Sequence, residues 1–171
     1  KPYNDEWKIM GAAAYGDKKR FLKKIEEIVY VDKEGLFLDK NFFTYSDTRF
    51  SGYYNHKLKN HLKINLEKND YKSQDFFDLA ASVQAVFEKI LIQLLRYLYK
   101  ITKKKKLVIN GGTAMNCLAN GKIVSQTDFQ DIYVSFAPGD LGSSIGAVLF
   151  NIASKSKKVF RCDISPYLGP S

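Results

Sequence analysis

The sequence predicts an α/β fold in which two neighbouring parallel strands are each followed by a helix. A long amphipathic pattern covers residues 74–101, and after it apolar strand-like runs at 107–110 and 131–136 alternate with helical stretches. Alternation of this kind favours parallel strands joined by helical crossovers. The 171 residues suit a single domain spanning 1–171. The 45% apolar and 26% charged content excludes wholesale disorder.

The sequence predicts four successive segments between residues 5 and 72. Residues 5–16 form a short helix or turn rich in Gly and Ala, which allow close backbone approach. Residues 17–28 form an amphipathic helix, and residues 28–38 form a hairpin. Residues 40–72 are rich in aromatic side chains, Asn and Lys without a clear period. They predict a long loop with one helical turn.

The strongest signal is the helix over residues 74–101, which Ser73 can cap at its N-terminus. Its apolar stripe contains Phe76, Ala80, Val83, Phe87, Ile90, Leu94 and Tyr97. The positions expected on the outer face are Asp78, Ser82, Glu88, Lys89, Gln93, Arg96 and Lys100. Burying a large apolar side chain contributes roughly 1.5–3 kcal/mol, so this helix is expected to organise the core.

The net charge of +9 raises the possibility of a nucleic-acid partner. Only four of the 27 basic residues are Arg, the residue preferred for bidentate phosphate contacts, which argues against that partner. The run Lys103–Lys106 is interpreted as a solvated turn. No apolar run reaches the roughly 20 residues that a membrane-spanning helix needs.

The cysteines and histidines give no pattern of a metal or disulfide site. Cys117 and Cys162 are far apart without CxxC spacing, which suits a reducing, cytoplasmic environment. Cys117 is expected to be buried and inert on an apolar helix face. His56 and His61 are five residues apart, unlike a helical metal pair, and both are expected on the surface.

The first candidate loop, residues 110–116, follows the first predicted parallel strand. Gly111 and Gly112 precede a helix expected from Thr113, and such a turn can hold an anion through backbone N–H groups. Asn116 is expected one turn into this helix, with an amide able to contact a ribose or carbonyl. A Gly-Gly bend that only tightens the turn is an equal alternative. The Asn-Gly pair at 120–121 is expected to end the helix.

The second candidate loop, residues 138–142, follows the second predicted strand, and Asp140 stands before a helix expected from Leu141. On spacing alone, an N-cap role for the Asp140 carboxylate is favoured over a metal ligand or substrate contact. No Ser-His-Asp or Cys-His arrangement can be placed. The catalytic residues, including a general base, therefore remain unknown from the sequence.

Five stretches in order resemble the O-carbamoyltransferase family of the nodulation and antibiotic-tailoring type (NodU/CmcH). They are EWKIMGAAAYG at 6–16, DLAASVQ at 78–84, GGTAMNC and ANG within 111–121, PGD and IGA within 138–147, and YLGP at 167–170. A more distant likeness is to tRNA threonylcarbamoyl-transfer proteins.

The resemblance implies an actin-like, ribonuclease-H-like (ASKHA) nucleotide-binding fold, mainly its second lobe. It implies ATP-dependent transfer of a carbamoyl group from carbamoyl phosphate, through carbamoyl adenylate, to a hydroxyl of a small molecule such as a sugar or antibiotic. The family's first lobe and C-terminal carbamoyl-phosphate domain are expected outside this chain, in the remainder of the same protein. The piece alone is then expected to be inactive. The alternatives are a tRNA threonylcarbamoyl-transfer-like protein and another actin-like ATPase lobe.

The resemblance also assigns candidate site residues. The positions that match the family's nucleotide contacts are Gly11, Gly111, Gly112 and Asn116. Asp140 matches an aspartate that joins two histidines on a divalent metal, Fe or a Mg/Mn-like ion, and this raises the ligand interpretation above the N-cap. The paired histidines, HxxxH, do not occur in this sequence, and His56 and His61 do not match them.

Overall fold

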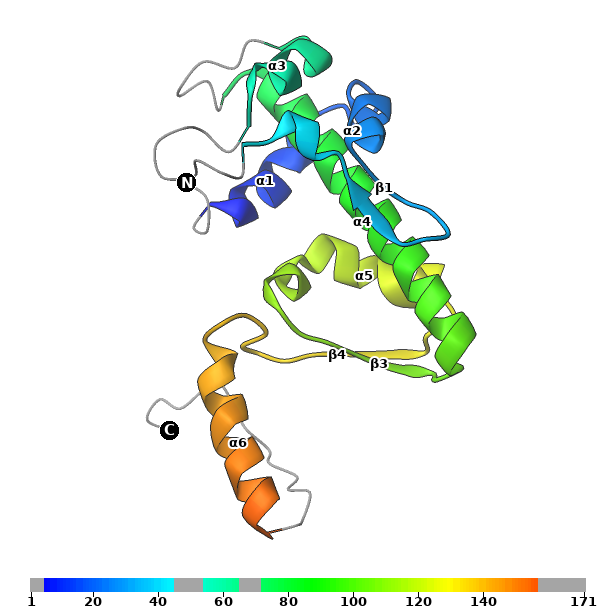
Figure 1. The fold of residues 1–171 in the computed structure, drawn as a ribbon, viewed down its shortest axis with the longest axis vertical. Helices are drawn as coiled ribbons and strands as arrows, with labels where there is room; N and C mark the ends of the chain where they lie inside the picture. Colours follow the sequence, from blue (N-terminus) through cyan, green and yellow to red (C-terminus); the bar gives the residue numbers. More distant parts are fainter. Residues whose placement is uncertain (1–4, 45–53, 65–71, 157–171) are drawn as a thin grey trace. The chain divides into compact units, whose positions relative to one another are not determined.

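The computed structural model describes residues 5–44, 54–64 and 72–156, and these form a mixed α/β structure (Figure 1). The chain divides into two compact units, Lys1–Lys103 and Lys104–Ser171. The expectation of one domain over the whole chain stays a prediction.

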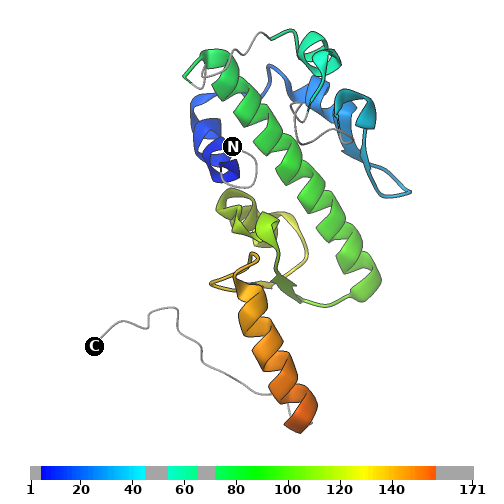
Figure 2. The ribbon, with the colours of Figure 1, turned by 60° about the vertical axis from the view of Figure 1, so that its left-hand side comes forward.

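The first unit is organised around helix α4, Gln74–Thr102, whose 29 residues confirm the predicted long helix. Ser73 caps it as expected, since its Oγ accepts the Phe76 N–H at 3.2 Å. The helix ends where Lys103 adopts a left-handed conformation with φ of 53°. Figures 1 and 2 both show α1 running beside α4, in agreement with the contacts between these two helices.

Seven shorter elements complete the described part of the first unit: α1 Glu6–Ala12, the 3-10 helix η1 Ala13–Tyr15, α2 Leu22–Ile28, β1 Val29–Val31, β2 Leu36–Leu38, the 3-10 helix η2 Lys40–Phe42 and α3 His56–Leu62. Strands β1 and β2 pair antiparallel, which confirms the predicted hairpin. Helices α1, η1 and α2 and strand β1 all contact α4. The segment 40–72, expected as a long loop with one helical turn, contains in its described part the seven-residue helix α3, which Asn55 caps.

The core of this unit contains Phe21, Ile25, Ile28, Leu62 and Val86. The predicted outer face of α4 is wrong at two positions, because Asp78 and Ser82 are 4% and 0% exposed. Both side chains accept hydrogen bonds from the segment before α2. Their burial therefore leaves neither side chain without a hydrogen-bond partner. Val83 and Tyr97, expected inside, are exposed.

One histidine also departs from the expectation. His56 is exposed as predicted, whereas the side chain of His61 is only 22% exposed. The His61 Nε2 atom lies 3.0 Å from the carbonyl oxygen of Lys24, and the ring packs on Phe42. His61 therefore joins α3 to α2 and η2 instead of standing on the surface.

The second unit contains β3 Lys106–Ile109, the 3-10 helix η3 Gly112–Met115, α5 Cys117–Gln126, β4 Asp131–Val134 and α6 Gly142–Ser156. Strands β3 and β4 pair parallel, with Leu107 opposite Ile132, which confirms the predicted strand arrangement. The expected helix stop at Asn120-Gly121 is wrong. Helix α5 continues past it, because the Asn120 side chain donates to the Ala114 carbonyl and leaves the helical backbone bonds intact.

Burial in the second unit is uneven. Leu107, Ala119, Ile123 and Phe129 are buried, whereas Cys117 is exposed and so contradicts the expectation of a buried thiol. Cys117 is the first residue of α5, and the buried residues of this helix, Ala119 and Ile123, lie on another face. Helix α6 has no buried residue. No helix in the described part of the chain is long and apolar enough to cross a membrane.

Candidate functional site

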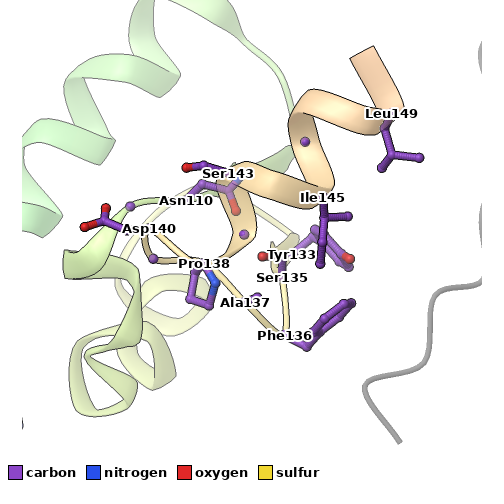
Figure 3. A pocket seen from close by; sticks show the side chains of 14 residues that line it. Asn110, Tyr133, Ser135, Phe136, Ala137, Pro138, Asp140, Ser143, Ile145 and Leu149 are labelled. Carbon is purple, nitrogen blue, oxygen red and sulfur yellow. The ribbon is translucent and has the colours of Figure 1, made fainter. Parts of the chain in front are cut away.

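A pocket of about 570 Å³ opens in the second unit where β3 and β4 end and α6 begins (Figure 3). Its lining includes Asn110 and Gly111 after β3, Tyr133 from β4, and residues 135–140 from the loop that follows. Ser143, Ile145 and Leu149 contribute from α6. The carboxyl ends of parallel strands are where open α/β sheets bind ligands, so the pocket has the position expected of a binding site.

The two loops that the sequence singles out are joined directly. Gly111 donates its backbone N–H to the Pro138 carbonyl at 2.7 Å, and its carbonyl accepts the Ala114 N–H. Gly111 has a φ of 99°, a conformation that side-chain-bearing residues rarely adopt. A glycine is therefore required where the chain leaves β3 and crosses to the second loop.

The second loop depends on a close approach at the first residue of α6. A Cβ on Gly142 would lie 2.0 Å from the Ala137 carbonyl oxygen, so only glycine fits there. The turn is closed by backbone bonds from Gly142 to Gly139 and from Ser143 to Asp140. Together these contacts fold the chain sharply between β4 and α6 and bring the first turn of α6 beside the strand ends.

Two of the five candidate residues, Gly111 and Asp140, line the same pocket. Gly112 follows Gly111 directly, is exposed, and does not line it. Asn116 does not line it either. It is the N-cap of α5 and its Oδ1 accepts the Ala119 N–H at 3.0 Å, because Thr113–Met115 belong to η3 and the α-helix starts only at Cys117.

Gly11 lies in the first unit, near the end of α1, where it is exposed and would leave open space around an added Cβ. Its predicted contact with the nucleotide stays a prediction.

Asp140 does not occupy the N-cap position that spacing alone favours. Helix α6 begins at Gly142, so Leu141 precedes it directly and Asp140 lies one residue further back. The Asp140 carboxylate is exposed and accepts no hydrogen bond from the described residues. The described residues also contain no group of three His, Cys, Asp or Glu side chains that could hold a metal.

Sequence reasoning missed several side chains that line the pocket. Asn110, Ser135 and Ser143 bring polar side chains, and none of these three side chains is hydrogen-bonded to another described residue. Tyr133, Phe136 and Ile145 supply an apolar wall and lie together in the view of Figure 3. The alternation of β4 was the available signal, because Tyr133 and Ser135 fall on the same face of an extended chain.

The sequence of this chain is similar to those of several known proteins and matches one family model. The family model described as carbamoyltransferase N-terminus matches residues 1–149. Nodulation protein NolNO of Sinorhizobium fredii is 32% identical over 148 residues, covering 85% of this chain and 20% of that protein. Nodulation protein NolO of Bradyrhizobium diazoefficiens is 31% identical over 145 residues, covering 85% of this chain and 24% of that protein.

An uncharacterized protein of Methanocaldococcus jannaschii, MJ1058, is 28% identical over 172 residues, covering 99% of this chain and 26% of that protein. The chain therefore spans about a fifth to a quarter of the length of these relatives. Because the family model matches most of its residues, the chain belongs to the carbamoyltransferase N-terminus family.

Proposed function

We propose that this chain is the nucleotide-binding part of an enzyme that transfers a carbamoyl group from carbamoyl phosphate, through carbamoyl adenylate, to a hydroxyl of a small molecule. The observation that carries the proposal is the shared pocket: Gly111 and Asp140, from loops after successive parallel strands, both line it. The family membership supports the carbamoyl chemistry. An actin-like, ribonuclease-H-like arrangement is part of the same proposal.

The size and lining of the pocket support a nucleotide as its ligand. Its volume of about 570 Å³ lies within the roughly 300–1,000 Å³ usual for small-molecule sites. The side chains of Asn110, Ser135 and Ser143 can donate hydrogen bonds to ribose or phosphate oxygens, because none of them is hydrogen-bonded to a described residue. The apolar wall at Tyr133 and Phe136 suits a flat base.

The residues described supply part of a metal site at most. Asp140 offers one exposed carboxylate, whereas divalent ions in proteins usually have three or more protein ligands or keep several waters. No group of three ligating side chains exists among the described residues. An Fe or Mg/Mn-like ion at Asp140 would therefore take its other ligands from elsewhere in the protein.

The proposed transfer needs positioning more than acid–base chemistry. A hydroxyl oxygen of the acceptor attacks the carbamoyl carbon, and the bond from that carbon to the phosphate oxygen of AMP breaks. AMP leaves, and the hydroxyl proton passes to the leaving phosphate or to water. Holding the adenylate and the acceptor together contributes through orientation, and donors aimed at the carbonyl oxygen stabilise its developing charge. None of the described residues is assigned as the general base.

The test is isotope exchange between pyrophosphate and ATP in the full-length protein. Label from pyrophosphate should enter ATP only when carbamoyl phosphate is present, because adenylate formation is the reversible step. Asp140→Ala should abolish the exchange while circular dichroism shows an intact fold. Exchange that ignores carbamoyl phosphate would instead favour an actin-like ATPase lobe. Tight, steeply salt-dependent tRNA binding in a filter assay would favour a threonylcarbamoyl-transfer-like protein.

A further inference from the structure

Helix α6 is fastened to the second unit at its start. Among the described residues, the backbone hydrogen bonds that join it to the preceding loop run from Gly142 to the Gly139 carbonyl and from Ser143 to the Asp140 carbonyl. No residue of α6 is buried. A 15-residue helix that is held at one end, and buries nothing along its length, can turn about that end with little loss of packing. We call residues 137–142 the α6 hinge.

One side of α6 faces the pocket. Four of its lining residues recur at intervals of three and four and therefore share one face of the helix: Gly142, Ile145, Gly146 and Leu149. Ile145 and Leu149 are half-buried, whereas Phe150 is 76% exposed and does not line the pocket. Helix α6 therefore has an inner face that borders the pocket and an outer face that contains Phe150.

The sheet presents an uncovered surface on the other side of the pocket. Val108 and Tyr133 lie opposite each other in the parallel register, so their side chains share a face of the sheet. They are 63% and 60% exposed, whereas Leu107, on the opposite face, is 7% exposed. Parallel sheets are normally covered on both faces. In Figure 3, Ile145 of α6 lies beside Tyr133, so the inner face of α6 is placed to supply the cover.

The lining of the pocket carries almost no charge. Among the described residues that form it, Asp140 is the only Asp, Glu, Lys, Arg or His. Three of its backbone N–H groups already donate within the loops: those of Gly111, Gly142 and Ser143. A phosphate needs cationic side chains or free N–H groups to balance its charge. The neutral hydroxyls and amide that remain, beside aromatic rings, suit a flat, uncharged group instead.

We propose that α6 and the uncovered sheet face form a clamp. Helix α6 turns about its hinge onto the strands and holds the flat, uncharged part of the ligand between Ile145 and Leu149 on one side and Tyr133 on the other. The identity of the ligand rests on the proposed function, in which this part is the base with its ribose, and the phosphates lie outside the clamp. The closing motion itself does not rest on that function.

Disulfide formation in the full-length protein tests the motion without any ligand. Val108→Cys combined with Leu149→Cys puts thiols on the two facing surfaces. Val108→Cys combined with Phe150→Cys is the matched control, because Phe150 is the next residue of α6 but belongs to its outer face. None of the three residues is buried, so these variants should fold.

The two pairs should oxidise at different rates. A disulfide needs Cα atoms within about 7 Å, so we expect the Leu149 pair to form it at least about tenfold faster than the Phe150 pair. Mass spectrometry of the joined peptides measures both rates. Equal rates would show that α6 does not close with its inner face on the sheet and would overturn the proposal.

Adenosine and inorganic tripolyphosphate separate the two halves of an adenine nucleotide. Adenosine should slow amide hydrogen exchange in α6 severalfold, because a closed helix opens less often, whereas tripolyphosphate should leave it unchanged. Leu149→Ser should weaken the effect of adenosine, and Phe150→Ser should retain it. Protection by tripolyphosphate but not by adenosine would mean that the charged half enters the pocket, and would overturn the proposal.

Failure of the clamp can be told apart from failure of the proposed function. If the full-length protein shows the isotope exchange that depends on carbamoyl phosphate, but neither adenosine nor ATP changes amide exchange in α6, the clamp is overturned. If the isotope exchange itself is absent, the proposed function is overturned. The disulfide rates then decide whether α6 closes on the sheet.

Discussion

At the scale of single residues, Ser82 is the clearest case of a polar group that stabilises by being satisfied. Ser82→Ala removes the acceptor of the Phe21 N–H in a site with no solvent access. Leaving such a donor unpaired costs about 1–3 kcal/mol. We expect urea unfolding to show a loss of this size. Ser125→Ala, at an exposed site on α5, should stay within about 0.5 kcal/mol, and equal losses in both variants would contradict this account.

Asp78 makes the stability of the protein depend on pH. The Arg20 guanidinium, the Asp17 N–H and the Gln74 amide hold the pKa of the Asp78 carboxyl below its usual range. A carboxyl whose pKa is lowered in the folded state stabilises the fold at pH values above its pKa in the unfolded state, about 3.9. This stability is lost as the pH falls through the folded-state pKa. The difference in unfolding free energy between the unaltered protein and Asp78→Asn should therefore be constant near neutral pH and shrink below about pH 4. A difference independent of pH down to acid unfolding would contradict it.

Residue-level burial was the least predictable feature from the sequence. Periodicity placed Asp78 and Ser82 outside because polar residues usually face solvent. The information that reverses this lies about 60 residues earlier, in the backbone of Asp17 and Phe21, and a helical pattern does not contain it. Asn116 shows the same limit: its role as the N-cap of α5 depends on where that helix starts, which the sequence pattern placed earlier, and its predicted ligand contact stays a prediction.

At the scale of elements, Gly142 and Gly146 on α6 allow a matched comparison of two glycine substitutions. An added Cβ at Gly142 meets the Ala137 carbonyl at 2.0 Å, whereas at Gly146 it meets nothing within 4 Å. Gly142→Ala should therefore lower stability, because the loop after β4 must move. Gly146→Ala should raise stability by up to about 1 kcal/mol through helix propensity. Thermal unfolding of both variants measures this, and the same direction of change in both would contradict it.

Element type was predictable because it depends on local pattern. The long stripe of α4, the turn between β1 and β2, and the glycines after β3 each carry their own signal. The sheet pairing followed from the alternation of strands and helices. The end of α5 was not predictable, since an Asn-Gly pair resembles a stop unless the Asn120 side chain finds the Ala114 carbonyl.

At the scale of the whole molecule, the sequence identified the two loops that meet at the pocket but not what surrounds them. Gly111 and Asp140 were recognisable as residues following strands. The polar side chains of Asn110 and Ser143 were not, because isolated Asn and Ser residues occur throughout any surface. The family model matches residues 1–149, so this match ends within α6.

The distribution of apolar burial gives a last prediction for the chain as a whole. Ile123 is fully buried, whereas Val148 and Phe150 on α6 are 58% and 76% exposed. Truncating a buried isoleucine to alanine costs about 2–5 kcal/mol, and replacing exposed side chains changes stability by no more than about 0.5 kcal/mol. Ile123→Ala should therefore lower the unfolding free energy strongly, and the double variant Val148→Ser, Phe150→Ser should leave it nearly unchanged. Because exposed apolar surface promotes association, the double variant should also self-associate less in sedimentation experiments. A loss of stability in the double variant comparable to that of Ile123→Ala would show that α6 is packed in solution, contrary to its exposure in this structure.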